Sequence, residues 1–238
     1  DSRMKRIFLI VLAGLLVLSV PLLAVLGVKR ARQPSQTFDP AAYQGRVLVL
    51  DAGHGGEDGG AVSAAGDKES DVNLAIVLRL EQLMGLYGVP VALTRSDDRS
   101  IHDQSADTLR EKKVSDLKNR LALVEGLENA ALLSVHQNSY PDPRYSGAQV
   151  FYASTAESQQ WAEQTQELLC QGLDPANDRV ARSVPDTVYL MDHVTCPAIL
   201  VECGFMSNGE EVSLLLTSGY QTKIAAALAA ACVQYLRQ

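Results

Sequence analysis

Short apolar runs that are typical of buried strands alternate along this chain with segments of helical period. The runs are RVLVLD (46–51), VPVALTR (89–95), ALLSVHQ (131–137), AQVFYA (148–153) and PAILVE (197–202). Apolar residues recur at helical spacing from Glu69 to Gly88, and again from Ile224 to Tyr235. Strands that are apolar on both sides and alternate with helices indicate a mostly parallel sheet flanked by helices on both faces. We therefore predict a single α/β domain over residues 46–238.

The segment from Ser96 to Lys113 interrupts this alternation. It is charged and nearly free of large apolar residues, so we expect a long surface loop. A connection of this length favours a place at the rim of a functional site.

The four cysteines of the chain do not form a redox or zinc-ribbon pattern. Cys170, Cys196, Cys203 and Cys232 show no CxxC spacing. Each lies in an apolar segment, so we expect buried free thiols, although an exported domain would permit a disulfide.

An apolar segment near the amino end is long enough to span a membrane. Ile7 to Val28 is 22 residues long and carries no charge. As a helix it would reach about 33 Å, enough to cross a hydrocarbon core. We predict a basic end (1–6), a transmembrane signal anchor (7–28) and a polar linker (29–45).

A cleaved signal peptide is the alternative for this segment. Its small-residue site would be at Gly27, but the apolar run exceeds the usual signal core and three basic residues follow the site. Because a short basic amino end normally stays cytoplasmic, we expect a single-pass protein of the cytoplasmic membrane. Residues 46–238 would then lie on the extracytoplasmic side.

The body of the chain is strongly acidic. Beyond residue 32, acidic residues outnumber basic ones by 27 to 15, a net charge of −12. Such a body repels polyanions, so nucleic acid is not an expected partner.

Four residues of types that bind metals or transfer protons lie at one edge of the predicted sheet. His54 follows the first strand, His136 lies at the end of the third and Glu202 at the end of the fifth. Glu69 opens the first helix, where the helix dipole favours a carboxylate. Functional groups of open α/β sheets gather beyond the carboxyl ends of the strands, so we expect these side chains to meet.

These four residues suit zinc-dependent hydrolysis. His, Glu and His form a known catalytic zinc set, and a further glutamate can act as general base for water whose pKa the metal lowers to about 7. The glycines around His54 would let the metal and a bulky substrate approach the backbone. Spacing alone leaves structural alternatives open: a turn histidine, a helix-start acid at Glu69 and a surface acid at Glu202. His102 and His193 are not expected to bind metal.

Five blocks follow one another in an order that matches a known family. They are LDAGHGGEDGGA, GDKESDVNLAI, TRSDD with KNRLALV, LLSVHQNS with GAQVFY, and PAILVECGFMSNGEE. From Val47 to Leu236 the chain thereby resembles the catalytic domain of zinc-dependent N-acetylmuramoyl-L-alanine amidases of the AmiC-like type. These enzymes hydrolyse the amide that joins muramic acid to the stem peptide of peptidoglycan. The resemblance implies one Zn²⁺ ion held by His54, Glu69 and His136, with Glu202 as the catalytic glutamate.

Neighbouring residues carry further expectations. Asn138 and Asn208 are weaker candidates for substrate hydrogen bonds, and Asn208 is also expected to cap the helix that follows it. Gln137 stands where the family usually has alanine. Asp192 stands where many members have a basic residue, which argues against a contact with an anionic substrate group there.

The resemblance makes peptidoglycan the expected partner, while the sequence identifies no activating protein. A membrane-anchored amidase with a single domain is closest to the group associated with spore cortex maturation and germination. Two alternatives remain: a catalytically silent cell-wall-binding domain of the same fold, and a zinc peptidase that cuts stem peptides. The presence of all four chemical residues argues against the silent domain.

Overall fold

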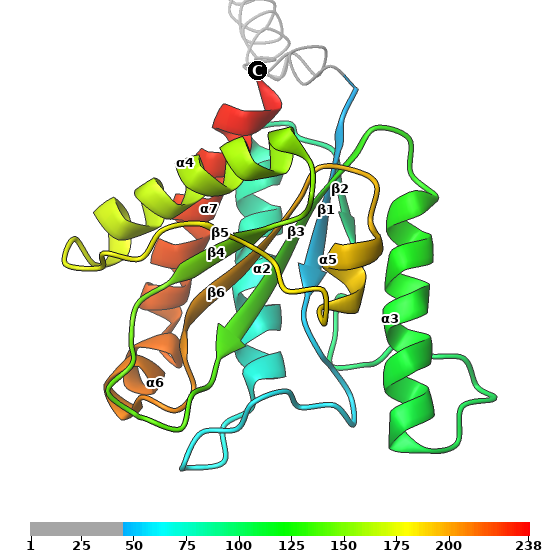
Figure 1. Cartoon of the computed structure of the whole chain (residues 1–238), viewed down its shortest axis with the longest axis horizontal. Coiled ribbons are helices and arrows are strands. Elements are labelled where there is room, and N and C mark those ends of the chain that lie inside the picture. Colours follow the sequence, from blue (N-terminus) through cyan, green and yellow to red (C-terminus); the bar gives the residue numbers. More distant parts are fainter. Residues whose placement is uncertain (1–44) are drawn as a thin grey trace, which may run out of the picture. The chain divides into compact units, whose positions relative to one another are not determined.

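A six-stranded sheet organises the part of the chain that the computed structural model describes, residues 45–238 (Figure 1). Its strands are β1 (Val47–Ala52), β2 (Val91–Leu93), β3 (Ala130–Asn138), β4 (Gln149–Tyr152), β5 (Arg182–Ser183) and β6 (Ala198–Phe205). They lie side by side in the order β2-β1-β3-β6-β4-β5. Each predicted apolar run forms a strand, and β5 is a short addition that the sequence did not predict.

The predicted amino-terminal elements lie outside the described residues. They are the basic end (1–6), the anchor (7–28) and all of the linker (29–45) except Gly45. Within residues 45–238, none of the helices combines the length and the apolar character needed to cross a bilayer. The anchor therefore stays a prediction.

The sheet is mixed, with four parallel pairs and one antiparallel pair. β1 runs parallel to β2 and β3, β3 to β6, and β4 to β5, whereas β4 runs antiparallel to β6. The prediction of a mostly parallel sheet is confirmed for those four pairs. β4 reverses because only ten residues separate it from β3, and a return to the parallel direction needs a crossover of about a dozen residues or more.

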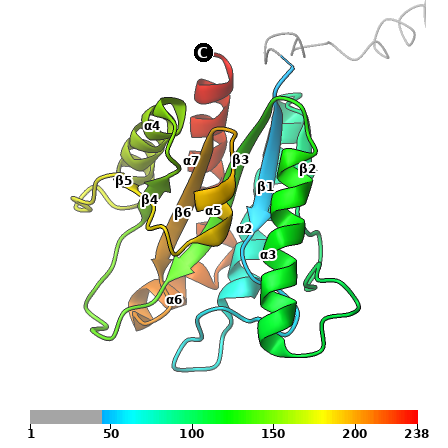
Figure 2. The same ribbon diagram turned by 45° about the vertical axis from the view of Figure 1, so that its right-hand side comes forward.

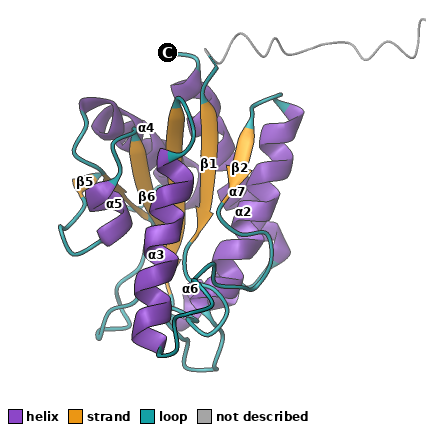
Figure 3. Ribbon diagram, turned by 90° about the vertical axis from the view of Figure 1, so that its right-hand side faces the viewer, coloured by secondary structure: helices purple, strands orange, loops and turns teal. Residues whose placement is uncertain are grey.

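Helices cover both faces of the sheet. They are α2 (Glu69–Leu86), α3 (Leu109–Glu125), α4 (Ala156–Leu173), α5 (Tyr189–His193), α6 (Gly209–Leu215) and α7 (Ser218–Leu236). α2, α4 and α7 bury one face in a cluster that includes Ile76 and Leu228. α3 and α5 bury the other face with Val124 and Leu190, and Figures 2 and 3 show these two helices in front of the sheet.

Helix α3 corrects the prediction of a loop from Ser96 to Lys113. The loop ends at Thr108, and the last five residues of the predicted loop begin the helix. The N–H of Glu111 donates to the Thr108 hydroxyl (3.2 Å), and the N–H of Thr108 donates to the Glu111 carboxylate (2.9 Å). This capping box is a Thr-x-x-Glu start signal, which here outweighs the charged composition.

The cysteines are all free, as predicted, but not all buried. Cys203 and Cys232 are buried, whereas Cys170 and Cys196 are half-buried. The latter two lie where apolar segments reach the surface, near the end of α4 and in the turn before β6. Position in an apolar segment therefore overestimated their burial.

Shortening a buried side chain of α7 tests the main core. Leu228 is fully buried between the helices and the sheet. We expect Leu228→Ala to lower the free energy of unfolding by about 2–5 kcal/mol, because it loses apolar burial and leaves a cavity. Leu214→Ala is the control, since Leu214 is 48% exposed on α6, and it should change stability by less than about 0.5 kcal/mol. Urea denaturation measures both, and equal losses in the two variants would contradict this packing.

Candidate functional site

His54 lies in the loop after β1, in a backbone conformation that residues other than glycine seldom adopt. His54 has φ 61°, and Gly55 and Gly56 follow with φ 137° and 61°. A non-glycine residue in this left-handed region is uncommon, and holding it there costs about 1–2 kcal/mol. The surrounding structure must therefore hold His54 in place.

Two glycines of this loop make room for the site itself. A Cβ on Gly53 would overlap the imidazole of His136, and one on Gly60 would lie 2.5 Å from Oε2 of Glu69. The glycines were expected to admit metal and substrate. The structure shows that they also admit the imidazole and carboxylate of the site, which pack directly on the backbone.

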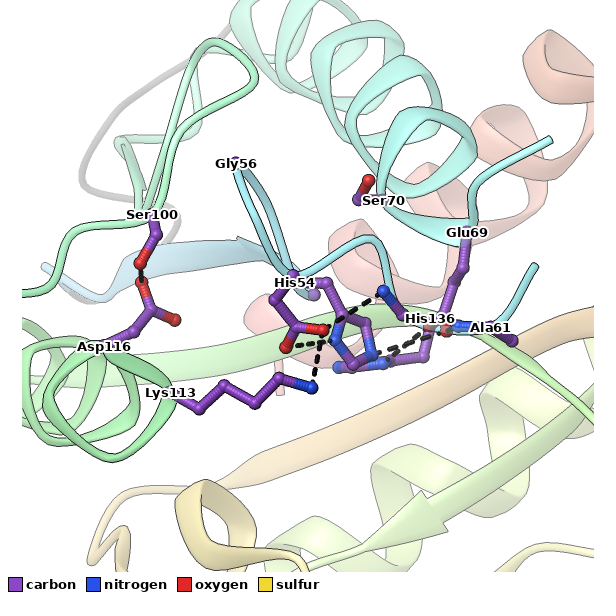
Figure 4. Close-up of polar contacts among 12 residues, drawn as sticks. His54, Gly56, Ala61, Glu69, Ser70, Ser100, Lys113, Asp116 and His136 are labelled. Carbon is purple, nitrogen blue, oxygen red and sulfur yellow. Dashed lines mark hydrogen bonds and ion pairs between the residues drawn. The ribbon is translucent and has the colours of Figure 1, made fainter. Parts of the chain in front are cut away.

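His54, Glu69 and His136 point toward one another (Figure 4). The distance from His54 Nε2 to Glu69 Oε2 is 3.4 Å, and from His136 Nδ1 to Glu69 Oε1 it is 2.9 Å. One donor atom from each residue lies within 4.8 Å of the other two. Donors on a tetrahedral ion with bonds of about 2.1 Å are about 3.4 Å apart. The three side chains therefore fit a single metal ion such as zinc.

Glu69 is held by backbone and side-chain donors at the start of α2. The N–H groups of Ala61 and Gln137 donate to its carboxylate at 2.8 and 3.0 Å, and Nδ2 of Asn73 donates at 3.2 Å. Burial alone would raise the pKa of Glu69, but hydrogen bonds with the two histidines lower it far below its usual range. Glu69 is therefore an oriented anion between two imidazoles.

His54 is oriented by a second carboxylate. Its Nδ1 lies 3.0 Å from Oδ2 of Asp58, which leaves Nε2 facing Glu69. Lys113 of α3 pairs with the other oxygen of Asp58 at 2.8 Å. Burial lowers the pKa of His54, but Asp58 and Glu69 outweigh it and raise the pKa to about 9. A carboxylate behind a histidine is typical of metal sites, and this anionic surrounding favours a bound cation.

Glu202 lies beside the three donors but in a different environment. It is paired with His136 across β3 and β6, so both side chains leave the same face of the sheet. Its Oε2 is buried and has no hydrogen-bond partner among the described residues. Burial raises the pKa of Glu202 to about 7, against the lowering effect of His136. Such a carboxyl group can exchange a proton near neutral pH.

A cavity of about 330 Å³ opens next to the two histidines. Its floor includes Ser134 and Leu200 of the sheet, one wall includes Leu117 of α3, and the other wall is formed by residues 187–191 around α5. The cavity therefore gives a substrate a place beside His54 and His136.

The structure brings together the four residues that carry the predicted chemistry, while the substrate contacts of Asn138 and Asn208 stay predictions. The Asn138 carboxamide accepts from the N–H of Ser139, and Asn208 accepts from the first N–H groups of α6, as the capping prediction required. His102 contacts Ser100, and His193 contacts the backbone of Tyr189. Asp192 lies 3.4 Å from His193 on α5.

Sequence reasoning missed the polar groups beneath the site. Asp51, Arg95 and Arg120 are at most 2% exposed, yet they carry charge. Arg120 shares a helical face with Leu117 and Val124, and a charge among apolar positions is a signal that could have found it. Arg95 lies two residues beyond β2, outside any apolar helical pattern, and offered no comparable signal.

Gly53→Ala tests how tightly the site is packed. The new methyl group must displace the His136 imidazole, so we expect the affinity of the three donors for an added divalent ion such as Zn²⁺ to fall at least tenfold, as when metal-site orientation is disturbed. Gly85→Ala is the matched control, because nothing lies within 4 Å of its added Cβ in α2. Competition with a chromophoric chelator measures affinity, and unchanged binding in Gly53→Ala would contradict the geometry.

Comparison with known proteins gives a consistent family. Residues 48–234 match the family described as N-acetylmuramoyl-L-alanine amidase. The germination-specific N-acetylmuramoyl-L-alanine amidase of Bacillus subtilis (strain 168) is 34% identical over 197 residues. That alignment covers 82% of this chain and 81% of the relative.

Solved structures agree with this match. The structure of the CwlD amidase from Clostridioides difficile, in complex with the GerS lipoprotein, has a TM-score of 0.77 at 37% identity. The match covers 80% of this chain and 98% of that chain. The amidase AmiC2 of Nostoc punctiforme has a TM-score of 0.70 at 29% identity, with 98% of it and 81% of this chain covered. This chain therefore belongs to the N-acetylmuramoyl-L-alanine amidase family, whose members hydrolyse the amide bond between N-acetylmuramic acid and L-alanine in peptidoglycan.

Proposed function

We propose that this amidase is zinc-dependent and holds one Zn²⁺ ion with His54, Glu69 and His136. The convergence of these three donors beside Glu202, whose Oε2 has no hydrogen-bond partner within residues 45–238, carries the proposal. A zinc ion supplies Lewis acidity, which acidifies water and polarises an amide carbonyl. Asp58 would orient His54, and the donors to Glu69 would orient its carboxylate.

Glu202 is the proposed general base and then general acid. Its carboxylate accepts a proton from the attacking water, whose oxygen forms a bond to the lactyl carbonyl carbon. The C–N bond then breaks, and Glu202 gives the proton to the leaving nitrogen of L-alanine. A pKa near 7 suits a group that must both accept and donate a proton at neutral pH. The products are a free lactyl carboxyl group and a stem peptide with a free amino end.

The relatives also suggest a biological setting. One curated relative is a germination-specific amidase, and one structural neighbour was solved with a lipoprotein partner. We extend the proposal to the peptidoglycan of the spore, in cortex maturation or germination. The lipoprotein complex of that neighbour supports a search for a protein activator of this chain as well.

The proposed site of action is the outer side of the cytoplasmic membrane. Residues 7–28 carry this part of the proposal, because their length and lack of charge suit a transmembrane anchor. Residues 46–238 would then meet peptidoglycan outside the membrane.

Membrane fractionation tests the anchor. We expect the native protein to stay with membranes through a high-salt wash, because burial of apolar surface holds it and salt screens only charge. Immunoblotting of the washed membranes and the supernatant measures the distribution. A soluble fragment that begins near Val28 would instead identify a cleaved signal peptide.

Glu202→Gln tests the chemistry. The amide keeps the size of the side chain but cannot accept the proton, so we expect turnover on purified sacculi to fall by about 10²–10⁴-fold. Zinc content should stay near one per chain, whereas His136→Ala should lose zinc and activity together. Mass analysis of the released stem peptides and elemental analysis of the protein provide the two measurements.

The same digest separates the competing functions. Stem peptides that begin with L-alanine identify the amidase, cleavage within the stem would identify a peptidase, and unchanged sacculi would identify a silent binding domain. Loss of zinc in Glu202→Gln would move Glu202 into the ligand set, and full turnover in this variant would remove it from the mechanism.

A further inference from the structure

Two buried arginines lie directly beneath the loop that carries His54. Arg95 is 1% exposed and Arg120 is 2% exposed. Neither side chain belongs to the three donors or to Glu202. Arg95 donates only to main-chain carbonyl groups, and Arg120 donates to two carbonyls and two carboxylates.

Arg95 joins the His54 loop to the first turn of α2. Its Nε donates to the carbonyl of Ala52 (2.8 Å), and its Nη2 donates to those of Gly53 (3.1 Å) and Ser70 (2.8 Å). Nη1 donates to the carbonyl of Asp97 (3.0 Å). Gly53 precedes His54 and Ser70 follows Glu69, so one guanidinium group links the neighbours of two metal donors.

Arg120 joins the same loop to α3. Its Nη2 donates to the carbonyl of His54 itself (2.7 Å), and its Nη1 donates to that of Ala52 (2.8 Å). Carboxylates of Asp51 and Asp116 balance its charge at 2.5 and 2.7 Å. Together the arginines bind the three carbonyls of residues 52–54.

The loop requires such support. His54, Gly55 and Gly56 are consecutive residues with positive φ, and glycine has little preference among backbone conformations. Local sequence therefore does not select the conformation that turns His54 toward Glu69. Contacts from distant segments must select it.

We propose that Arg95 and Arg120 are positioning residues that hold the main chain around His54 and fix its separation from Glu69. This inference rests on the proposed zinc site. A positive charge close to a divalent cation repels it, so the charge of the arginines does not itself favour metal binding. The arginines act instead through the geometry of the guanidinium fork. Lysine keeps the charge but presents a single nitrogen, which cannot reach the carbonyls of two separate elements in the same way.

Zinc titration of the full-length chain and its variants tests this inference. We expect Arg95→Lys to weaken zinc binding by about 10–100-fold, the range for residues that orient metal ligands. Arg79→Lys is the control, since Arg79 donates to a carbonyl of its own helix and should leave the dissociation constant unchanged. Arg95→Met separates geometry from charge. If Arg95 acted only through its charge, zinc binding would be tighter in Arg95→Met and unchanged in Arg95→Lys.

Thermal unfolding of the zinc-free proteins accompanies the titration. If Arg95→Lys lowers the unfolding temperature but the folded protein binds zinc as tightly as the unmodified chain, Arg95 is merely structural and the inference is wrong. If the unmodified chain binds no zinc, the proposed function fails before the variants are compared.

If Arg95→Lys does not fold, hydrogen exchange of the unmodified chain tests whether the loop of His54 is ordered without zinc. The N–H groups of Gly53 and Gly55 donate to backbone carbonyls at 3.0 and 2.8 Å. If the arginines organise the loop, these amides are protected in zinc-free protein as well as in zinc-loaded protein. Protection that arises only when zinc is added would overturn the inference, because the metal would then order the loop.

Discussion

A buried carboxylate at the end of β1 holds the functional edge of the sheet together. Asp51 accepts hydrogen bonds from three side chains of different elements. They are Thr94 just after β2, Ser134 in β3 and Arg120 in α3. Burial alone would raise the pKa of Asp51, but Arg120 and the two hydroxyls lower it to about 2. Because an unpaired charge at this depth is strongly destabilising, these elements are bound to one another. The loop of His54 is built on that connection.

The two glutamates of the site show how environment separates the roles of identical side chains. Burial alone would raise the pKa of both, yet Glu69 has histidines and backbone donors around it, and its pKa lies far below the usual range. Glu202 has a buried oxygen with no partner among the described residues, and its pKa rises to about 7. Opposite shifts in neighbouring carboxyl groups are a mark of a divided task. They support Glu69 as an ionised ligand and Glu202 as the proton carrier.

Periodicity predicted most elements of the domain, because buried strands and helices of an α/β sheet differ in their apolar spacing. The four chemical residues could be predicted because each lies at a strand end or helix start. The contacts of Arg95 and Arg120 with residues 52–54 and with α2 could not, since those partners are backbone carbonyls at least 25 residues away. The reversal of β4 depended on loop length, and the start of α3 on a local cap that composition concealed.

The two walls of the cavity are attached to the domain in different ways. α3 is bound to the His54 loop through Arg120 and Lys113, whereas α5 rests on the sheet through the apolar side chains of Leu190 and Met191. A substitution in the first wall would therefore strain the backbone that carries His54. One in the second wall would reshape the cavity and leave the hydrogen bonds of that loop intact.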